Sequence, residues 1–268
     1  MGHMWQDAPV YFVLAQVRFN PILKLDSFVG AIQDSLRREY PDFQRVTTMT
    51  LVVAPSGVGG APPQPTPENR YLLNNMDKTA GFSLDTASLA FQSTDYPRFP
   101  AFSEAFLKGL AAVNDAVGLS FVERVGIRYL NAVYPGPGEA LGSYLIPEVR
   151  GLTEKLQGTL THTFSETRTR DAADNALVAR ALVHDGSVGF PPDLAHTQLK
   201  VAERFGFLRG RHAILDIDAA AERRLAFDIA QGASRLDELH DTAKAAFRAM
   251  VTDAAWQMWQ LQDKGTRT

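Results

Sequence analysis

The chain has 268 residues, 45% of them apolar, which is ordinary for a protein with a full hydrophobic core. It contains no cysteine, which excludes structural disulfides, thiolate zinc sites and a cysteine nucleophile. The formal charge of −3 leaves no overall basic field for non-specific binding to nucleic acid or acidic membranes. No apolar run approaches the roughly 18 to 20 residues that cross a bilayer, and the chain does not open like a secretory signal. We therefore expect a cytoplasmic protein without membrane contact.

The first half of the chain predicts one helix between strands and a second helix at its end. Residues 1 to 4, Met1-Gly2-His3-Met4, resemble the remnant of a removed tag. Residues 10 to 19 then alternate in a way that predicts a strand with one fully buried side, and apolar residues at helical spacing predict a helix over 25 to 40. Further elements of this half are strands at 45 to 53, 81 to 86 and 88 to 94, a loop rich in proline and glycine at 55 to 67, and a helix at about 100 to 116.

The second half predicts the same succession of elements. The stretch "RVGIRYLNAVYPGPGEALG", residues 124 to 142, predicts a strand, a glycine turn and the start of a helix. Strands are expected at 158 to 170, 175 to 185 and 212 to 219. A long amphipathic helix is expected from Ser234 to about Gln262, with Ser234 and Asp237 as its capping pair.

The two halves open on similar strands, "AQVRFNP" and "VGIRYLN", in which Arg18 matches Arg128 and Phe19 matches Tyr129. This succession predicts an α+β protein built as a tandem β-α-β-β-β-α pseudo-repeat of roughly 120 to 130 residues per unit. Its antiparallel strands would form one or two sheets, with the helices on one face. The expected halves are residues 5 to 118 and 119 to 268, packed together as one globular unit.

The glycine turn is not predicted to bind a nucleotide. A dinucleotide-binding turn needs G-x-G-x-x-G between a buried parallel strand and a helix. Gly136, Gly138 and Gly142 are spaced G-x-G-x-x-x-G instead, and Pro137 removes a backbone N–H from inside the turn. The following run at 158 to 170 is polar at alternate positions, which suits an antiparallel, half-exposed strand. The turn is therefore interpreted as one that ends a strand and starts a helix.

A metal site is a further hypothesis. His212, Asp216 and Asp218 share one face of a predicted strand, which could hold a hard cation for a metal-dependent hydrolase. The alternative is an exposed face on which these carboxylates pair with arginines, for which Arg168, Arg170 and Arg180 are candidates. The dipeptides His184-Asp185 and His240-Asp241 resemble phosphohydrolase metal motifs, but we interpret them as a solvated strand end and a helix surface.

Arginines on the predicted strands are the main candidate binding residues. Arg124 and Arg128 share a strand face opposite Val125, Ile127 and Tyr129, and Arg18 holds the corresponding place in the first half. Such arginines either pair with acids, for which Glu123 and Glu166 are candidates, or present a guanidinium fork to an anionic ligand or a partner. The candidate ligand- or partner-binding residues that result share this exposed strand face: Arg18, Arg124, Arg128, Arg168 and Arg180.

The sequence resembles a sporadically distributed family of uncharacterised bacterial proteins of unknown function. The resemblance rests on the strand "ERVGIRYLN" (123 to 131), the preceding "STDYPRFPAFSEAF" (93 to 106) and the C-terminal helix "LDELHDTAKAAFRAMVTDAAWQMW" (236 to 259). It implies no activity, cofactor or catalytic residue. The patchy distribution implies a place in a phage-defence or toxin-control locus.

The function expected from the sequence is binding without catalysis. No G-x-S-x-G, H-E-x-x-H or P-loop motif occurs, so no catalytic residues and no cofactor are predicted. The first hypothesis is a cytoplasmic protein that engages a protein partner. The second is a binder of nucleic acid or a nucleotide ligand through the arginine-bearing strand face, and the third is the metal-dependent hydrolase. The sequence leaves open whether two chains pair as a homodimer through the long helices.

Overall fold

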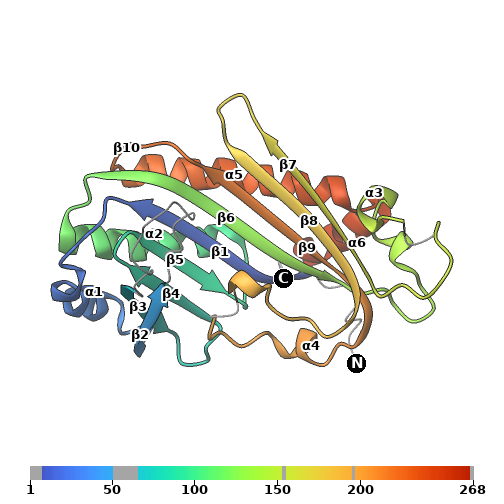
Figure 1. Ribbon diagram of the computed structural model, residues 1–268, viewed down its shortest axis with the longest axis horizontal. Helices are drawn as coiled ribbons and strands as arrows, with labels where there is room; N and C mark the ends of the chain where they lie inside the picture. Colours follow the sequence, from blue (N-terminus) through green and yellow to red (C-terminus); the bar gives the residue numbers. More distant parts are fainter. Residues whose placement is uncertain (1–7, 51–65, 153–154, 195–196, 266–268) are drawn as a thin grey trace, which may run out of the picture.

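A computed structural model of the chain describes residues 8–50, 66–152, 155–194 and 197–265. Ten antiparallel strands in these residues form one sheet, in the order β2-β3-β4-β5-β1-β6-β9-β8-β7, and β10 continues the pairing of β9 along β6 (Figure 1). The strands are β1 (Val10–Phe19), β2 (Asp42–Thr50), β3 (Thr66–Asn74), β4 (Ala80–Asp85), β5 (Ser88–Ser93), β6 (Phe121–Val133), β7 (His162–Arg170), β8 (Ala176–Gly186), β9 (Gly210–Ala221) and β10 (Leu225–Ala226). The predicted α+β class with an antiparallel sheet is confirmed.

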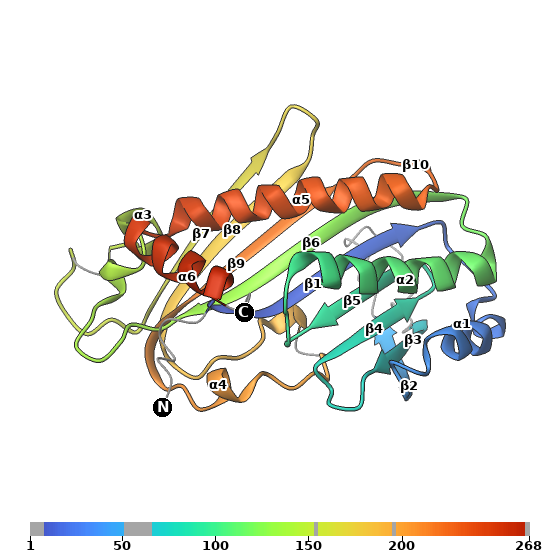
Figure 2. The same ribbon diagram turned by 180° about the vertical axis from the view of Figure 1, so that it is seen from behind.

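The longer helices cover one face of the sheet. They are α1 (Val29–Leu36), α2 (Phe99–Val117), α5 (Ile229–Met250) and α6 (Asp253–Gly265), and Figure 2 shows α2 and α5 in front of the strands. Apolar stripes on these helices face the inward side chains of the strands: Phe106 on α2 and Leu236 on α5 are buried in the same core cluster as Val13 and Ile127. The predicted placement of these helices on one face is confirmed.

The opposite face is covered only in part. The chain between β8 and β9 packs there, and it contains the short helices η3 (Pro192–Leu194) and α4 (Glu203–Gly206). Leu194 and Phe205 bury a second, smaller core cluster against Tyr11, Leu130 and Ile214 of the central strands. The rest of this face of the sheet is left for polar side chains.

No helix in the described ranges is both long and apolar enough to cross a membrane.

The two halves of the chain have similar strand orders. In each, the first strand lies beside the last strand, and the others follow outward in reverse chain order: β1-β5-β4-β3-β2 and β6-β9-β8-β7. The two first strands, β1 and β6, pair with each other at the centre, with Gln16 opposite Gly126. A single sheet therefore runs through both halves, while a tandem repeat of sequence units stays a prediction.

Several predicted boundaries are wrong. Strand β3 falls in a stretch for which no element was predicted; residues 55 to 65 of the preceding loop lie outside the described residues. The helix predicted over 25 to 40 has only eight α-helical residues, those of α1, after the 3-10 turn η1 (Leu25–Ser27). The glycine turn leads into the three-residue 3-10 helix η2 (Leu141–Ser143), followed by the four-residue α3 (Pro147–Arg150).

The single C-terminal helix expected from Ser234 is also wrong. Asp228 is the N-cap of α5, because its carboxylate accepts hydrogen bonds from the N–H groups of Ala230 and Gln231. Ser234 therefore lies inside the helix, and the proposed capping pair does not form its start. The helix ends at Met250 because Val251 is extended and bridges to Leu145, so that α6 begins as a separate helix.

Candidate functional site

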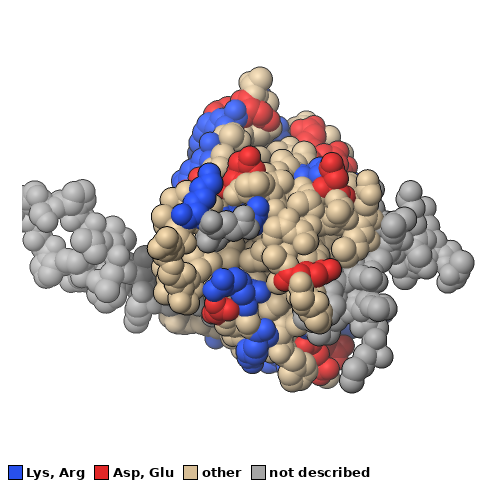
Figure 3. Space-filling view, turned by 90° about the vertical axis from the view of Figure 1, so that its right-hand side faces the viewer, with Lys and Arg blue, Asp and Glu red and all other residues tan. Residues whose placement is uncertain are grey.

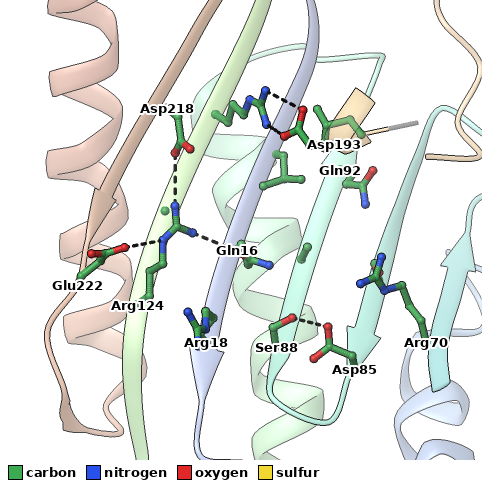
Figure 4. A pocket seen from close by; sticks show the side chains of 16 residues that line it. Gln16, Arg18, Arg70, Asp85, Ser88, Gln92, Arg124, Asp193, Asp218 and Glu222 are labelled. Carbon is green, nitrogen blue, oxygen red and sulfur yellow. Dashed lines mark hydrogen bonds and ion pairs between the residues drawn. The ribbon is translucent and has the colours of Figure 1, made fainter. Parts of the chain in front are cut away.

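A polar groove lies on the uncovered face of the sheet and has a volume of about 370 Å³ (Figure 4). Its residues come from six adjacent strands, β3 to β9 through β4, β5, β1 and β6, and from η3, which forms one wall. They share the face opposite α2 and α5: Leu14, Gln16, Arg18, Arg70, Ser83, Asp85, Ser88, Ala90, Gln92, Arg124, Gly126, Arg128, Asp193, Leu194, Asp218 and Glu222. The structure thus brings Arg18, Arg124 and Arg128 together in one groove.

Arg124 lies across the strand rather than projecting from it. Its guanidinium donates to Oε1 of Gln16 at 3.0 Å and to Oδ1 of Asp218 at 3.5 Å, and its Nε lies 3.6 Å from Glu222 (Figure 4). Gly126 makes this position possible, because a Cβ there would lie 2.8 Å from Nη1 of Arg124. The groove floor therefore contains an arginine whose hydrogen-bonding groups are turned toward this chain's own side chains.

Arg128 is held even more tightly and is only 8% exposed. Its Nε and Nη2 donate to the two carboxylate oxygens of Asp216, each at 2.7 Å, and its Nη1 donates to Asp193 of η3. Burial disfavours the charged guanidinium, yet the hydrogen bonds to Asp216 and Asp193 raise the pKa of Arg128 above its ordinary value. The hydrogen bond from Arg128 also lowers the pKa of Asp193. Arg128 is thus a structural link that ties η3 to the sheet.

Arg168 and Arg180 continue this charge pairing toward the sheet edge. Arg180 donates to Asp216 at 3.2 Å and to Glu166 at 2.6 Å, and Glu166 also accepts from Arg168 at 2.7 Å. These hydrogen bonds from Arg168 and Arg180 lower the pKa of Glu166 to about 2. Glu166 thus pairs with Arg168 and Arg180, and not with Arg124 or Arg128, for which it was a predicted partner. Glu123, the other predicted acid, pairs with Arg224 instead.

Arg18 and Arg70 differ from these arginines. Neither forms an ion pair or a hydrogen bond with any residue in the described part of the chain. Arg18 is exposed on β1 and Arg70 is half-buried on β3, and Figure 4 shows them on opposite sides of Asp85 and Ser88. Asp85 accepts hydrogen bonds from the N–H of Ala87 and the hydroxyl of Ser88, but it pairs with no cation among the described residues. The groove therefore offers two unpaired guanidinium groups and one carboxylate to a ligand.

Sequence reasoning missed Arg70, Asp193 and Glu222. Arg70 went unnoticed because β3 was not predicted, although "NRYLLN" (69 to 74) places Arg70, Leu72 and Asn74 on one face and Tyr71 and Leu73 on the other. Asp193 lies in η3, a three-residue 3-10 helix that is too short to show a periodic pattern. No local signal could have placed it beside Arg128.

The residues of the hypothesised metal site have other partners. The carboxylates of Asp216 and Asp218 hydrogen-bond to Arg128 and Arg124, respectively, and burial raises the pKa of Asp218. His212 is buried between rings, with its centroid 4.4 Å from that of Tyr134 and 4.3 Å from that of His184. In the described ranges no three His, Asp or Glu side chains are grouped so that they could hold a metal ion. These carboxylates therefore pair with arginines, as in the alternative, but His212 and Asp216 are buried and not exposed. Of the three predicted partners only Arg180 contacts one of them, Asp216, whereas Arg168 and Arg170 pair with other acids.

The His-Asp dipeptides also have structural environments. His184 lies within β8 and contacts His212, close to the predicted strand end. His240 was predicted to lie on a solvated helix surface, and this prediction is wrong. Its ring stacks on Phe99 at 3.9 Å, and its Nδ1 lies 2.7 Å from the hydroxyl of Tyr129.

At the glycine turn, the N–H of Gly136 donates to the carboxylate of Glu139.

Acid is expected to weaken the fold through His212. Burial lowers the pKa of His212 below 6.5, so the unfolded chain binds a proton more readily than the folded chain. The free energy of unfolding should therefore decrease as the pH falls below about 6.5, with a slope of up to about 1.4 kcal/mol per pH unit from this one group. Urea unfolding between pH 7.5 and 5.5 should show a steeper decrease for the natural chain than for His212→Phe, which keeps a stacked ring without titrating. Equal slopes would contradict this role.

No protein-family model matches the chain, and no curated protein matches its sequence. The charge distribution gives a more direct indication of what the surface can bind. Figure 3 shows basic and acidic side chains intermixed on the side that it views, without a continuous basic field. The groove itself combines four arginines with Asp85, Asp193, Asp218 and Glu222. Such a surface is suited to a partner that offers both hydrogen-bond donors and acceptors.

Proposed function

We propose that the protein is a non-catalytic binding protein whose groove receives an extended, acid-containing segment of a protein partner. The observation that carries the proposal is the pair Arg18 and Arg70, which have no partner among the described residues although every other arginine of the groove is paired. An unpaired guanidinium in a groove is suited to binding a carboxylate through two parallel hydrogen bonds.

The dimensions of the groove support a polymeric ligand. Its lining comes from six adjacent strands, and five strand spacings of about 4.8 Å amount to about 24 Å. An extended polypeptide rises about 3.3 Å per residue, so about seven residues would cross the groove. A protein segment of that length could place two carboxylates against Arg18 and Arg70.

The chemistry of the lining favours polypeptide over nucleic acid. Asp85 lies between Arg18 and Arg70, and each of its carboxylate oxygens already accepts one hydrogen bond. Its remaining lone pairs can accept from a backbone N–H but would repel a phosphate. The apolar lining residues are Leu14, Ala90 and Leu194, so the groove provides no aromatic ring on which a base could stack. Amide side chains such as Gln16 and Gln92 can donate to the C=O groups and accept from the N–H groups of a peptide.

A labelled eight-residue peptide of alternating Glu and Ser should bind to the natural chain in fluorescence anisotropy. Replacing Arg18 or Arg70 with Gln should weaken binding by roughly tenfold or more each, because a charge-assisted hydrogen bond contributes about 1.5–3 kcal/mol. Arg38→Gln is the matched control: Arg38 is exposed and lies outside the groove, so its loss should leave binding unchanged.

Two comparison ligands make this experiment decisive. The same peptide with Gln in place of Glu should bind at least tenfold more weakly. A single-stranded DNA of eight nucleotides should bind weakly, whatever the sequence. Absence of peptide binding, together with DNA binding that falls steeply with salt, would overturn the proposal in favour of a nucleic-acid ligand.

A further inference from the structure

A larger cavity, of about 560 Å³, lies on the other side of the sheet, among the helices. Its wall residues come from the start of α2, from one stripe of α5 and from α6, and its floor comes from β6 and β9. Figure 2 shows the ends of α2 and α6 facing one another on this side of the sheet. The cavity is therefore separated from the arginine groove by the thickness of the sheet.

Aromatic rings dominate its lining. They are Tyr96, Phe99, Tyr129, Phe247, Trp256 and Trp259, together with the imidazole of His240. Phe247 lies 5.7 Å from Trp259 and 6.2 Å from Trp256, centroid to centroid, so the α5 and α6 walls form one continuous aromatic surface. A cavity of this size and lining is typical of sites that enclose a flat organic molecule.

The positive charge of the lining favours an anionic ligand. Arg98, Arg204 and Lys244 contribute cationic groups, and none of the described lining residues is an Asp or Glu. Arg98 and Lys244 are exposed at the rim and form no ion pair with any other described residue. Arg98 is also the N-cap of the 19-residue α2, where no side chain caps the first turn and the helix dipole favours an anion. A cationic ligand would meet only like charges.

Two polar features border the cavity. Trp259 is 7% exposed, and its buried indole N–H has no hydrogen-bond acceptor in the described part of the chain. Tyr129 connects the hydroxyl of Tyr96, at 3.4 Å, with Nδ1 of His240, at 2.7 Å. Burial raises the pKa of Tyr129 and lowers that of His240, so the hydroxyl stays protonated and donates to the neutral imidazole.

We propose that this cavity is a second binding site, which takes a flat aromatic molecule bearing one anionic group. The ring system would lie against Trp256, Trp259 and Phe247. The anionic group would face Lys244 and Arg98 at the rim. This site is independent of the peptide groove, since no residue lines both.

Calorimetric titration of the full chain with 2-naphthoate and with 2-naphthamide tests the proposal, because the two compounds share a ring system and differ in charge. Naphthoate should bind with one molecule per chain and at least tenfold more tightly than naphthamide. Lys244→Gln should weaken naphthoate binding by roughly tenfold and leave naphthamide binding unchanged. Phe247→Ala should weaken binding of both compounds.

The controls separate this site from the groove. Lys24→Gln removes another exposed lysine, which lies outside the cavity and forms no ion pair with a described residue, and it should change neither affinity. The Arg18→Gln variant, which tests the groove, should bind naphthoate as the natural chain does. Absence of saturable naphthoate binding, equal affinity for the two compounds, or naphthoate binding that is insensitive to Lys244→Gln would each overturn the proposal.

Discussion

Replacing Asp216 with asparagine is expected to lower the free energy of unfolding by about 3 kcal/mol, because the buried Arg128 then keeps only Asp193, a largely exposed carboxylate, as its acidic partner. Asp216 accepts two hydrogen bonds from Arg128 and one from Arg180. The side chains of Asp216 and Arg128 are each only 9% exposed, so water cannot replace the lost carboxylate. Asparagine keeps the shape but supplies one acceptor oxygen in place of two. Urea unfolding at neutral pH measures the difference.

An exposed pair provides the control for this variant. Asp174 pairs with Arg170 at 3.1 Å, but the two side chains are 77% and 53% exposed, so Asp174→Asn should change stability very little. The double variant Asp216→Asn with Arg128→Gln should recover part of the loss, because it removes the buried charge as well as its partner. A stability loss as small for Asp216→Asn as for Asp174→Asn would show that the buried pair is not what stabilises this face.

Replacing Gly109 with alanine is expected to lower the free energy of unfolding by about 2 kcal/mol, although alanine is the better helix former by about 1 kcal/mol. At Gly109, α2 lies very close to the sheet: a Cβ there would lie 2.1 Å from Cε1 of Phe82. Phe82 cannot move aside easily, because its ring packs against Tyr40 at 4.9 Å and Phe91 at 4.7 Å. The added methyl group must therefore displace the helix or the aromatic cluster.

Gly232 in α5 is the matched control for this effect. A Cβ at Gly232 meets no atom within 4 Å, so Gly232→Ala should stabilise the protein by about 0.5–1 kcal/mol through helix propensity alone. The combination of Gly109→Ala with Phe82→Leu should be less destabilising than the sum of the two single changes, because leucine makes room for the methyl group. Equal effects of alanine at the two glycines would contradict the close approach.

The arginine groove and the aromatic cavity differ in how much of each could be predicted. For the groove, alternation along β1 and β6 correctly placed Arg18, Arg124 and Arg128 on one face, opposite Val125, Ile127 and Tyr129. The cavity was not predicted at all. His240 belongs to a local helical pattern, but its neighbours Phe99 and Tyr129 come from distant parts of the chain.

The sequence by itself determined the secondary-structure types and the strand faces, because side-chain alternation and helical periodicity are local properties of a few consecutive residues. Only the tertiary structure decided which arginines are left unpaired. Arg128 pairs with Asp216 and Asp193 across 88 and 65 residues of chain. Arg18, its counterpart in the predicted pseudo-repeat, pairs with no acid among the described residues. Such pairings depend on strand order and register and on how the loop between β8 and β9 folds back. Those features are set by packing between distant segments, on which local patterns carry no information.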